Sequence, residues 1–236
     1  MKTLFRRHFK KQLSLLSIQQ VQSESQSILQ TILRDPFFQS CTHLCCYVPM
    51  LSGHEVDTTP LIQHVLSTSN SSNRPQLYVP IVGLDDRMEM VLVPDEQDFA
   101  SFEIRNEKYK LLEPPIESMP HRKNLMDSLN PSSRLLVIVP GLAFDFKKNR
   151  LGRGKGHYDQ FFDRLHALRE EKQFETLYAS VCFKCQFMDE SYEFPQEMSK
   201  ELDKYSSQKV DGKWVIPTEK HDVVMDKVLT FDRVVV

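Results

Sequence analysis

The sequence predicts an α/β fold, a three-layer sandwich with a mostly parallel sheet plus an antiparallel hairpin. Apolar runs of strand length recur along the chain, and segments with helical spacing of apolar residues lie between several of them. Two consecutive runs are separated by a short polar stretch, which is typical of a hairpin. The 236 residues fit a single domain over residues 1–236 better than two, because a chain of this length can bury a substantial core. The expected strands lie near residues 43–48, 77–82, 88–93, 134–139, 176–183 and 228–235.

Composition excludes several classes of partner. The formal net charge of −2 provides no general attraction to nucleic acid or to an anionic membrane, so we expect neither as a partner. No apolar run approaches the roughly 18 residues that a membrane-spanning helix needs. The five cysteines include one Cys-x-x-Cys, at Cys182 and Cys185, without a second pair at zinc-finger distance. We therefore expect reduced thiols, of which these two are small buried apolar side chains.

The N-terminal segment predicts a basic amphipathic helix, followed by more helix to about residue 34. Its first 23 residues contain five cations and no acid, with apolar residues at helical spacing. Lys2 and Arg6 are four residues apart, which places both cations on one face of the helix. An acid-free, arginine-containing amphipathic N-terminus is also typical of a mitochondrial presequence. These two interpretations compete for the same residues.

The middle of the chain contains a strand-to-helix loop, a hairpin and a proline-broken segment. Residues 57–60, Asp-Thr-Thr-Pro, are cap residues before a proline and predict a helix start. Glu55 therefore lies at the carboxyl end of a strand, where open α/β sheets bind ligands. Residues 67–75 form a polar connector ahead of the hairpin. Residues 114–131 predict a loop with a short helix.

Glycine and positive charge coincide in residues 141–156, which hold four of the seven glycines. Glycines occupy every second position from Gly152 to Gly156, with Arg153 and Lys155 between them. Such glycines can adopt positive φ and turn backbone N–H groups toward a ligand, while the interleaved cations add charge. An apolar strand precedes the run, and a segment with helical spacing follows it, so the loop opens onto a helix N-terminus. This pattern is typical of a polyphosphate-binding loop.

Two common phosphate-binding motifs do not fit this loop. A Walker A loop needs Ser or Thr after Gly-Lys, whereas Gly156 follows Lys155, and the third glycine spacing of the dinucleotide motif is wrong. The alternative without a ligand is a basic surface turn that uses glycine for geometry alone. Tyr158 and Asp159 favour a binding site, because they place a hydroxyl and a carboxylate that suits magnesium at the same helix start.

The run PGLAFDFKKNRLGRGKGHYD, residues 140–159, closely resembles the signature of the 5-formyltetrahydrofolate cyclo-ligases, also called methenyltetrahydrofolate synthetases. Members typically read Pro-Gly-x-x-Phe-Asp, a short variable piece, then Arg-Leu-Gly-Arg-Gly-Lys-Gly-Tyr-Tyr-Asp. His157 replaces the first tyrosine of that pair, which puts a stacking role of this ring in question, while Tyr158 is retained. The resemblance implies closure of 5-formyltetrahydrofolate to 5,10-methenyltetrahydrofolate through phosphorylation of the formyl oxygen. It also implies ATP as co-substrate, Mg²⁺ as cofactor, and ADP and phosphate as products.

The resemblance also implies roles for individual residues. The implied catalytic residues are Lys155, Arg153 and Tyr158. The implied ATP-binding residues are Lys2, Arg6, Arg150, Leu151, Gly152, Arg153, Gly154, Lys155, Gly156, His157 and Tyr158. The implied substrate-binding residues are Val48, Glu55, Arg153, Gly154, Lys155, Gly156 and His157. Magnesium is assigned to Asp159 and Asp222, with Asp226 as the competing candidate for the second position.

Other parts of the chain resemble the family less closely. The strand carrying Met88 and Met90 corresponds to one that runs close to the folate in the family, and we treat it as pocket lining. Tyr109 falls near a position where relatives carry an aromatic residue. Residues 186–213 are charged and poor in aliphatic side chains, so we expect a family-atypical insertion that is partly mobile and anchored by Trp214.

The family offers its own interpretation of the N-terminus, since members begin with a helix whose Lys-x-x-x-Arg pair reaches the nucleotide. Lys2 and Arg6 match this spacing, and cleavage of a presequence would discard one or both of them. We therefore expect a retained helix and a cytoplasmic protein, with a mitochondrial location as the alternative. We also expect a monomer, and the sequence leaves open how many glutamates the folate carries.

Two other functions fit part of the same pattern. A non-catalytic relative could keep a pocket for nucleotide, folate or RNA phosphate without turnover. The candidate metal carboxylates argue against it, as does the absence of interleaved basic and aromatic residues. A phosphosugar isomerase or CoA-transferase relative is the second alternative, and it rests on fold analogy.

Overall fold

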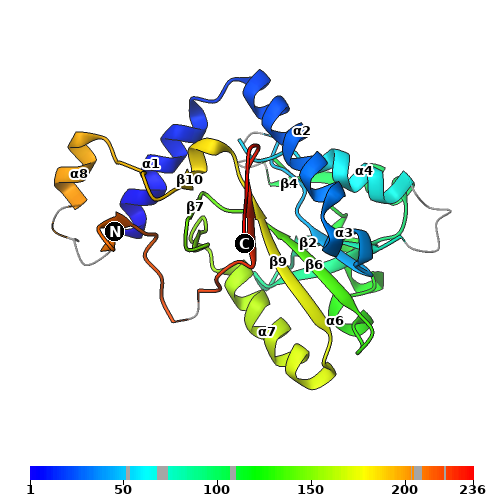
Figure 1. The fold of residues 1–236 in the computed structure, drawn as a ribbon. Helices are drawn as coiled ribbons and strands as arrows, with labels where there is room; N and C mark the ends of the chain where they lie inside the picture. The colour runs from blue at the N-terminus through cyan, green and yellow to red at the C-terminus, as the bar shows by residue number, and fades with distance from the viewer. Residues whose placement is uncertain (52–53, 68–73, 107–109, 203, 205–208, 221) are drawn as a thin grey trace.

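The computed structural model describes residues 1–51, 54–67, 74–106, 110–202, 204, 209–220 and 222–236. Within these residues, a seven-stranded sheet forms the centre of the molecule, in the order β14-β13-β9-β6-β1-β2-β3 (Figure 1). Its strands are β1 (His43–Cys46), β2 (Gln76–Val82), β3 (Met88–Val93), β6 (Arg134–Val139), β9 (Glu175–Val181), β13 (Lys227–Leu229) and β14 (Val234–Val235). The five central strands pair in parallel, and β3 pairs with β2 as an antiparallel hairpin. The predicted fold class is confirmed.

Helices cover both faces of the sheet. Successive residues of a strand point to opposite sides, so a buried strand packs apolar side chains on each face. Leu44 and Cys46 pack in one buried cluster, while Cys45 between them packs in another. The first cluster lies beneath α2 (Ile18–Arg34), α3 (Pro36–Ser40) and α4 (Thr59–Ser67). The second lies beneath α6 (Leu125–Ser128) and α7 (His157–Lys172). Together they make the three layers that the sequence predicts.

Local sequence signals fix where these helices begin. The Ser17 side chain accepts a hydrogen bond from Gln20 N, and the Gln20 side chain accepts one from Ser17 N, which forms a capping box at α2. Asp35 caps α3 ahead of its proline. The helix start predicted at residues 57–60 is confirmed, since Asp57 accepts a hydrogen bond from Thr59 N at the start of α4.

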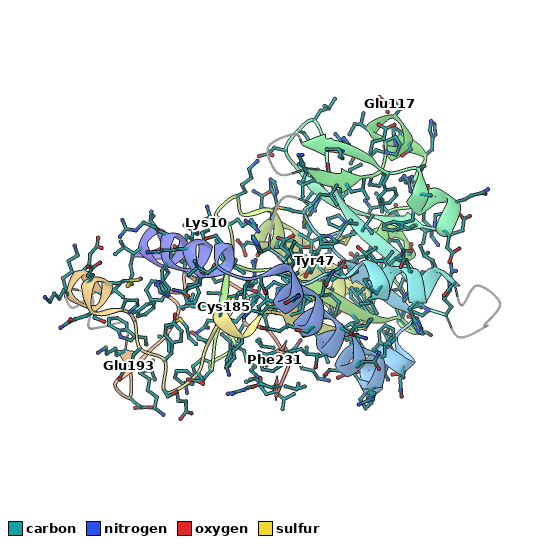
Figure 2. The ribbon with its side chains drawn as sticks, turned by 90° about the horizontal axis from the view of Figure 1, so that it is seen from above. Lys10, Tyr47, Glu117, Cys185, Glu193 and Phe231 are labelled. Atoms are coloured by element: carbon teal, nitrogen blue, oxygen red, sulfur yellow. The ribbon has the colours of Figure 1, made fainter. Side chains whose placement is uncertain are left out.

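Helix α1 (Lys2–Ser14) packs mainly into a third cluster through Phe5 and Phe9, while Leu13 near its end belongs to the first cluster. The partners of α1 are a small sheet of β10 (Phe187–Met188), β7 (Ala143–Asp145) and β8 (Arg150–Leu151), the helix α8 (Gln196–Leu202), and the hairpin of β11 (Lys209–Val210) and β12 (Lys213–Trp214). The buried members of this third cluster are Phe5, Phe9, Ala143, Leu151, Met188, Phe194, Leu202, Trp214 and Ile216. In Figure 2, Lys10 on α1 and Glu193 before α8 lie toward the same end of the molecule, away from Glu117.

The remaining elements include two departures from prediction. The single strand expected near 228–235 is wrong: a turn at Thr230, whose N–H bonds to Arg233 O, folds it into the antiparallel pair β13–β14. The β7–β8 hairpin between β6 and the glycine loop was not foreseen, because each strand is too short to leave a periodic signal. The other elements are α5 (Glu96–Ala100), β4 (Glu103–Asn106), β5 (Leu111–Glu113), the 3₁₀ turn η1 (Ile116–His121) and the 3₁₀ turn η2 (Lys184–Gln186). The short helix expected in residues 114–131 is confirmed as α6, and the 3₁₀ turn η1 precedes it.

Candidate active site

A pocket of about 790 Å³ opens at the carboxyl ends of β1, β2 and β6. Six separated parts of the chain line it: helix α1, the segment after β1, the hairpin β2–β3, the hairpin β4–β5, the loop 140–159, and the pair Glu219 and Asp222. The residues that the sequence analysis assigned to catalysis, ATP, substrate and magnesium all line this pocket, namely Lys2, Arg6, Val48, Glu55, Arg150, Leu151, Gly152, Arg153, Gly154, Lys155, Gly156, His157, Tyr158, Asp159 and Asp222. The fold therefore brings together residues up to 220 positions apart in sequence, such as Lys2 and Asp222.

The glycine loop has the backbone geometry that phosphate binding requires at two of its three glycines. Gly154 has φ +99° and Gly156 has φ +75°, and Gly156 is the N-cap residue of α7. Gly152 does not have positive φ, so that part of the prediction is wrong. Its lack of a side chain matters for a different reason, because a Cβ there would lie 3.1 Å from Arg150 Nη1. Its carbonyl accepts a hydrogen bond from Arg6 Nε at 3.0 Å.

The buried carboxylate of Asp145 holds this loop in place. Its Oδ1 accepts hydrogen bonds from Lys147 N and Asn149 N, and its Oδ2 accepts them from the Asn149 side chain and Ile216 N. Burial raises the pKa of Asp145 above its ordinary value, although these hydrogen bonds oppose the shift. The bond to Ile216 connects the loop to the segment that carries Asp222.

Arg150 and Asp159 form an ion pair at the start of α7. Arg150 Nη2 lies 2.7 Å from Asp159 Oδ1, and the Arg150 side chain is 8% exposed. Burial lowers the pKa of Arg150, while the charges of Asp159 and Asp222 oppose the shift. Arg150 Nε is buried without a hydrogen-bond partner among the described residues. The pair therefore places a poorly solvated cation beside both candidate metal carboxylates.

Helix α1 brings two more cations to the same place. Lys2 Nζ lies 2.8 Å from Asp222 Oδ2 and 2.9 Å from Glu219 Oε1. Burial acts to lower the pKa of Lys2, but its hydrogen bonds to these two acids outweigh that effect and raise it. Phe5 and Phe9 of the same helix are 0% exposed, so α1 is packed into the fold.

The two carboxylates assigned to magnesium share the pocket, and the competing candidate does not line it. Asp226 Oδ2 instead accepts a hydrogen bond from Tyr178 N, which ties β13 to β9. Among the described residues no group of three His, Cys, Asp or Glu side chains could hold a metal ion. Magnesium needs fewer protein ligands than that, since it is held by one or two carboxylates together with substrate phosphates and water. Asp159 and Asp222 therefore fit such an ion.

The remaining candidates also line the pocket. Arg153 Nη2 donates to Glu55 Oε1 at 3.0 Å, and Glu55 Oε2 accepts from Met50 N at 3.1 Å. The Tyr158 hydroxyl is buried without a hydrogen-bond partner among the described residues. Burial raises the pKa of Tyr158 well above its ordinary value, so the phenol stays protonated and can donate. Lys155 is exposed at the pocket surface.

Several lining residues were not found from the sequence. His157 Nε2 lies 3.2 Å from Asp86 Oδ1, in the turn of the β2–β3 hairpin. Arg105 and Glu113 enter the pocket from the β4–β5 hairpin, and Glu219 does so beside Lys2. No local pattern marks Asp86, Arg105, Glu113 or Glu219, because tertiary folding alone places them. Lining by the Met-x-Met strand is confirmed for Met88, whereas Met90 is core, and Tyr109 lies outside the described residues.

Comparisons with known proteins show which family this chain is similar to. The sequence model of the 5-formyltetrahydrofolate cyclo-ligase family matches residues 1–200. The mitochondrial 5-formyltetrahydrofolate cyclo-ligase of Arabidopsis thaliana is 34% identical over 152 residues, which is 63% of this chain but only 52% of that protein. The probable 5-formyltetrahydrofolate cyclo-ligase of Schizosaccharomyces pombe is 29% identical over 71% of this chain and 76% of its own length.

Solved structures support the fold. The NMR structure of 5,10-methenyltetrahydrofolate synthetase from Aquifex aeolicus superposes with a TM-score of 0.63 at 21% identity, covering 98% of this chain and 90% of the other. The 5,10-methenyltetrahydrofolate synthetase of Mycoplasma pneumoniae has a TM-score of 0.60 at 14% identity, with 98% of each chain covered. No helix in the described part of the chain has the length and hydropathy to cross a membrane.

Proposed function

Because the chain belongs to the 5-formyltetrahydrofolate cyclo-ligase family, we propose that it is a ligase that converts 5-formyltetrahydrofolate and ATP to 5,10-methenyltetrahydrofolate, ADP and phosphate. The observation that carries the proposal is the convergence of the loop cations, both α1 cations and two carboxylates on one pocket. A nucleoside triphosphate bound with a metal ion needs both cations and carboxylates, whereas an RNA-phosphate site needs the cations alone.

The reaction needs an activated formyl oxygen, because an amide oxygen is a poor leaving group. Transfer of the γ-phosphoryl group breaks its bond to the bridging oxygen of ADP and forms a bond to the formyl oxygen. The nitrogen at position 10 of the folate then attacks the formyl carbon and loses its proton. Phosphate departs with the former formyl oxygen, and the five-membered ring is closed.

The protein's part is to position the reactants and stabilise charge. Arg150, Arg153 and Lys155 are assigned to the phosphates. This is supported by their place in the pocket lining and by the glycine loop, which leads into the N-terminus of α7, where anions are favoured. Lys2 and Arg6 are assigned to the nucleotide. These interactions stabilise the negative charge that spreads over the transferred group.

The folate is assigned to the other part of the pocket. Val48 supplies an apolar surface there, and the Tyr158 hydroxyl supplies a buried donor. Glu55 fixes the direction of Arg153 through their hydrogen bond. The apolar and polar groups together suit a ring system that ends in polar atoms.

Asp159 and Asp222 would hold magnesium in this proposal. When bound with ATP, the ion neutralises part of the phosphate charge. Arg150 and Lys2, which pair with these carboxylates, keep both side chains directed into the pocket.

Two organisational proposals accompany the function. Residues 1–236 form one domain and a monomer, and residues 186–213 are a family-atypical insertion whose described part packs against α1 in the third cluster. Because α1 is part of the active site, a cytoplasmic location with an uncleaved N-terminus is proposed, and a mitochondrial location is the alternative. Mass spectrometry of the N-terminus from cells tests this, since a start beyond Arg6 would contradict it.

The test of function is a single optical assay. The methenyl product absorbs in the near ultraviolet, so purified protein mixed with 5-formyltetrahydrofolate and Mg-ATP should raise that absorbance, with ADP formed in equal amount. Folded protein that binds both ligands without raising the absorbance would instead support the non-catalytic relative.

A further inference from the structure

The β4–β5 hairpin supplies a wall of the pocket to which neither the phosphates nor the metal has been assigned. Its two strands pair with each other outside the main sheet. They contribute Arg105, Leu111, Leu112 and Glu113 to the pocket lining. Two are apolar and two are oppositely charged, which is a pattern suited to a planar ring with polar atoms along one edge.

Arg105 and Glu113 lie near each other but do not form a good hydrogen bond with each other. Arg105 Nη1 is 3.7 Å from Glu113 Oε2, beyond the range of a good N–H···O hydrogen bond. Their side chains are 20% and 14% exposed. Nη1 is buried and has no hydrogen-bond partner among the described residues, and such a donor is costly to leave unpaired. A ligand oxygen in the pocket would satisfy it.

Glu113 keeps acceptor capacity for a ligand. Its carboxylate accepts a hydrogen bond from the backbone of Val82, and an ionised carboxylate can accept more than one. Burial raises the pKa of Glu113, while the charges of Arg105 and His157 oppose the shift. Ligand N–H donors would stabilise the ionised form further.

We propose that Glu113 and Arg105 bind the 2-amino-4-oxo edge of the pteridine ring of a folate. This rests on the proposed function, since it places a folate in the pocket. The edge presents two neighbouring N–H donors, from the 2-amino group and the ring nitrogen at position 3, and then a carbonyl oxygen. Glu113 accepts from both donors, and Arg105 donates to the carbonyl. Met88, Leu111 and Leu112 supply apolar surface for the ring.

The charge of the pair favours the ring over the tail of the folate. A pteridine edge is neutral, and it meets a cation and an anion that together are neutral. A glutamate carboxylate would be attracted by Arg105 but repelled by Glu113 within the same site. A site for the tail would be expected to carry cations without an adjacent acid.

The central experiment compares Glu113→Gln with Glu103→Gln. The amide puts an N–H group opposite the ring donors, so Glu113→Gln should raise KM for 5-formyltetrahydrofolate roughly 10- to 100-fold. The KM for Mg-ATP and the thermal midpoint should not change. Glu103 is the matched control, because it lies opposite Glu113 in the hairpin but is exposed and does not line the pocket. Arg105→Ala should also raise the KM for 5-formyltetrahydrofolate, and the KM of Arg105→Lys should lie between those of Arg105→Ala and the wild-type protein.

Binding of the two halves of the folate identifies which part the pair contacts. By calorimetry without ATP, Glu113→Gln should weaken binding of tetrahydropterin and leave p-aminobenzoylglutamate unaffected. Wild-type affinity for tetrahydropterin in Glu113→Gln would overturn the inference, as would loss of p-aminobenzoylglutamate binding or an equal rise in both KM values. If Glu113→Gln does not fold, Arg105→Ala decides by the same measurements. Wild-type protein that makes no methenyl product contradicts the proposed function, yet these binding results still decide the inference.

Discussion

The glycine loop and helix α1 both bring cations to the pocket, but the fold supports them in different ways. The loop is held by backbone hydrogen bonds to the buried Asp145 carboxylate and by its position at the ends of the central strands. Helix α1 is held by apolar side chains in a separate cluster, with Phe5 and Phe9 at its centre. Lys155 is exposed in the first region, whereas Lys2 is paired with two acids in the second.

This difference separates chemistry from stability. A substitution of an exposed loop cation should alter turnover and leave folding intact, because the cation contributes little to the native state. A substitution in the third cluster should alter both, since α1 carries its cations only while it is packed. Substitutions in each region test whether turnover and stability respond separately. The largest effect is expected in the third cluster, where both should change.

Phe9→Ala tests the support of α1. Phe9 is 0% exposed, and truncation of a buried phenylalanine costs about 3 to 5 kcal/mol of unfolding free energy. We expect that loss by urea denaturation, together with a higher KM for ATP because Lys2 and Arg6 lose their position. Leu15→Ala is the control, since Leu15 is 68% exposed and should change stability by less than about 0.5 kcal/mol. Full stability of Phe9→Ala would mean that the third cluster does not hold the helix.

Lys155→Ala tests the loop. A cation about 4 Å from a phosphate oxygen contributes on the order of 4 kcal/mol at a surface-like dielectric, so turnover should fall several hundredfold. The thermal midpoint should be unchanged, because Lys155 is exposed. Lys147→Ala is the matched control in the same loop, since Lys147 is exposed but does not line the pocket. Ring closure at the wild-type rate by Lys155→Ala would refute its assigned role.

Asp222→Asn tests the metal assignment against its competitor. Loss of one charged ligand contact costs about 1.5 to 3 kcal/mol, so the Mg²⁺ concentration for half-maximal rate should rise at least about tenfold. Asp226→Asn should weaken the hydrogen bond to Tyr178 N and lower stability without changing the Mg²⁺ requirement. The reverse result would move the metal site to Asp226, outside the pocket.

The sequence was most informative where chemistry is local. Loop 140–159 is continuous, so its glycines, cations and Asp159 could be assigned from the order of the residues alone. The strands of the sheet were found because buried strands leave strong apolar signals. The turn at Thr230 was missed, because two short strands and a polar turn of this kind resemble one interrupted strand.

The rest of the site depends on tertiary placement. Asp222 could be proposed through the family resemblance, and only its position beside Lys2 separates it from Asp226. Arg105 and Glu113 carry no periodic or spacing signal, since a charged residue on a short strand is usually a solvated one. Their exposure of 20% and 14% and their place in the pocket follow from how the β4–β5 hairpin packs.

The smallest predicted effect is a pH dependence of the α1 support. His8 lies in this region with Nε2 2.7 Å from the Tyr192 hydroxyl, and burial, together with the charge of Lys11, lowers its pKa from the ordinary value of 6.5. As the pH falls through 6.5, the unfolded chain binds a proton that the folded chain resists, so the free energy of unfolding should decrease. The stabilising effect of neutral His8 is thus present above pH 6.5 and is lost on acidification.

The free energy of unfolding, measured with urea at about pH 7.5 and about pH 5.5, should therefore decrease less on acidification in His8→Gln than in the wild-type protein. Burial also lowers the pKa values of His43 and His166, so the difference between variant and wild type is the relevant quantity. His121→Gln is the control, because His121 is exposed in η1 and far from α1 in sequence. If the unfolding free energy of His8→Gln decreased between the two pH values as much as that of the wild-type protein, the neutral imidazole would make no contribution. This end of the molecule would then be held by apolar packing.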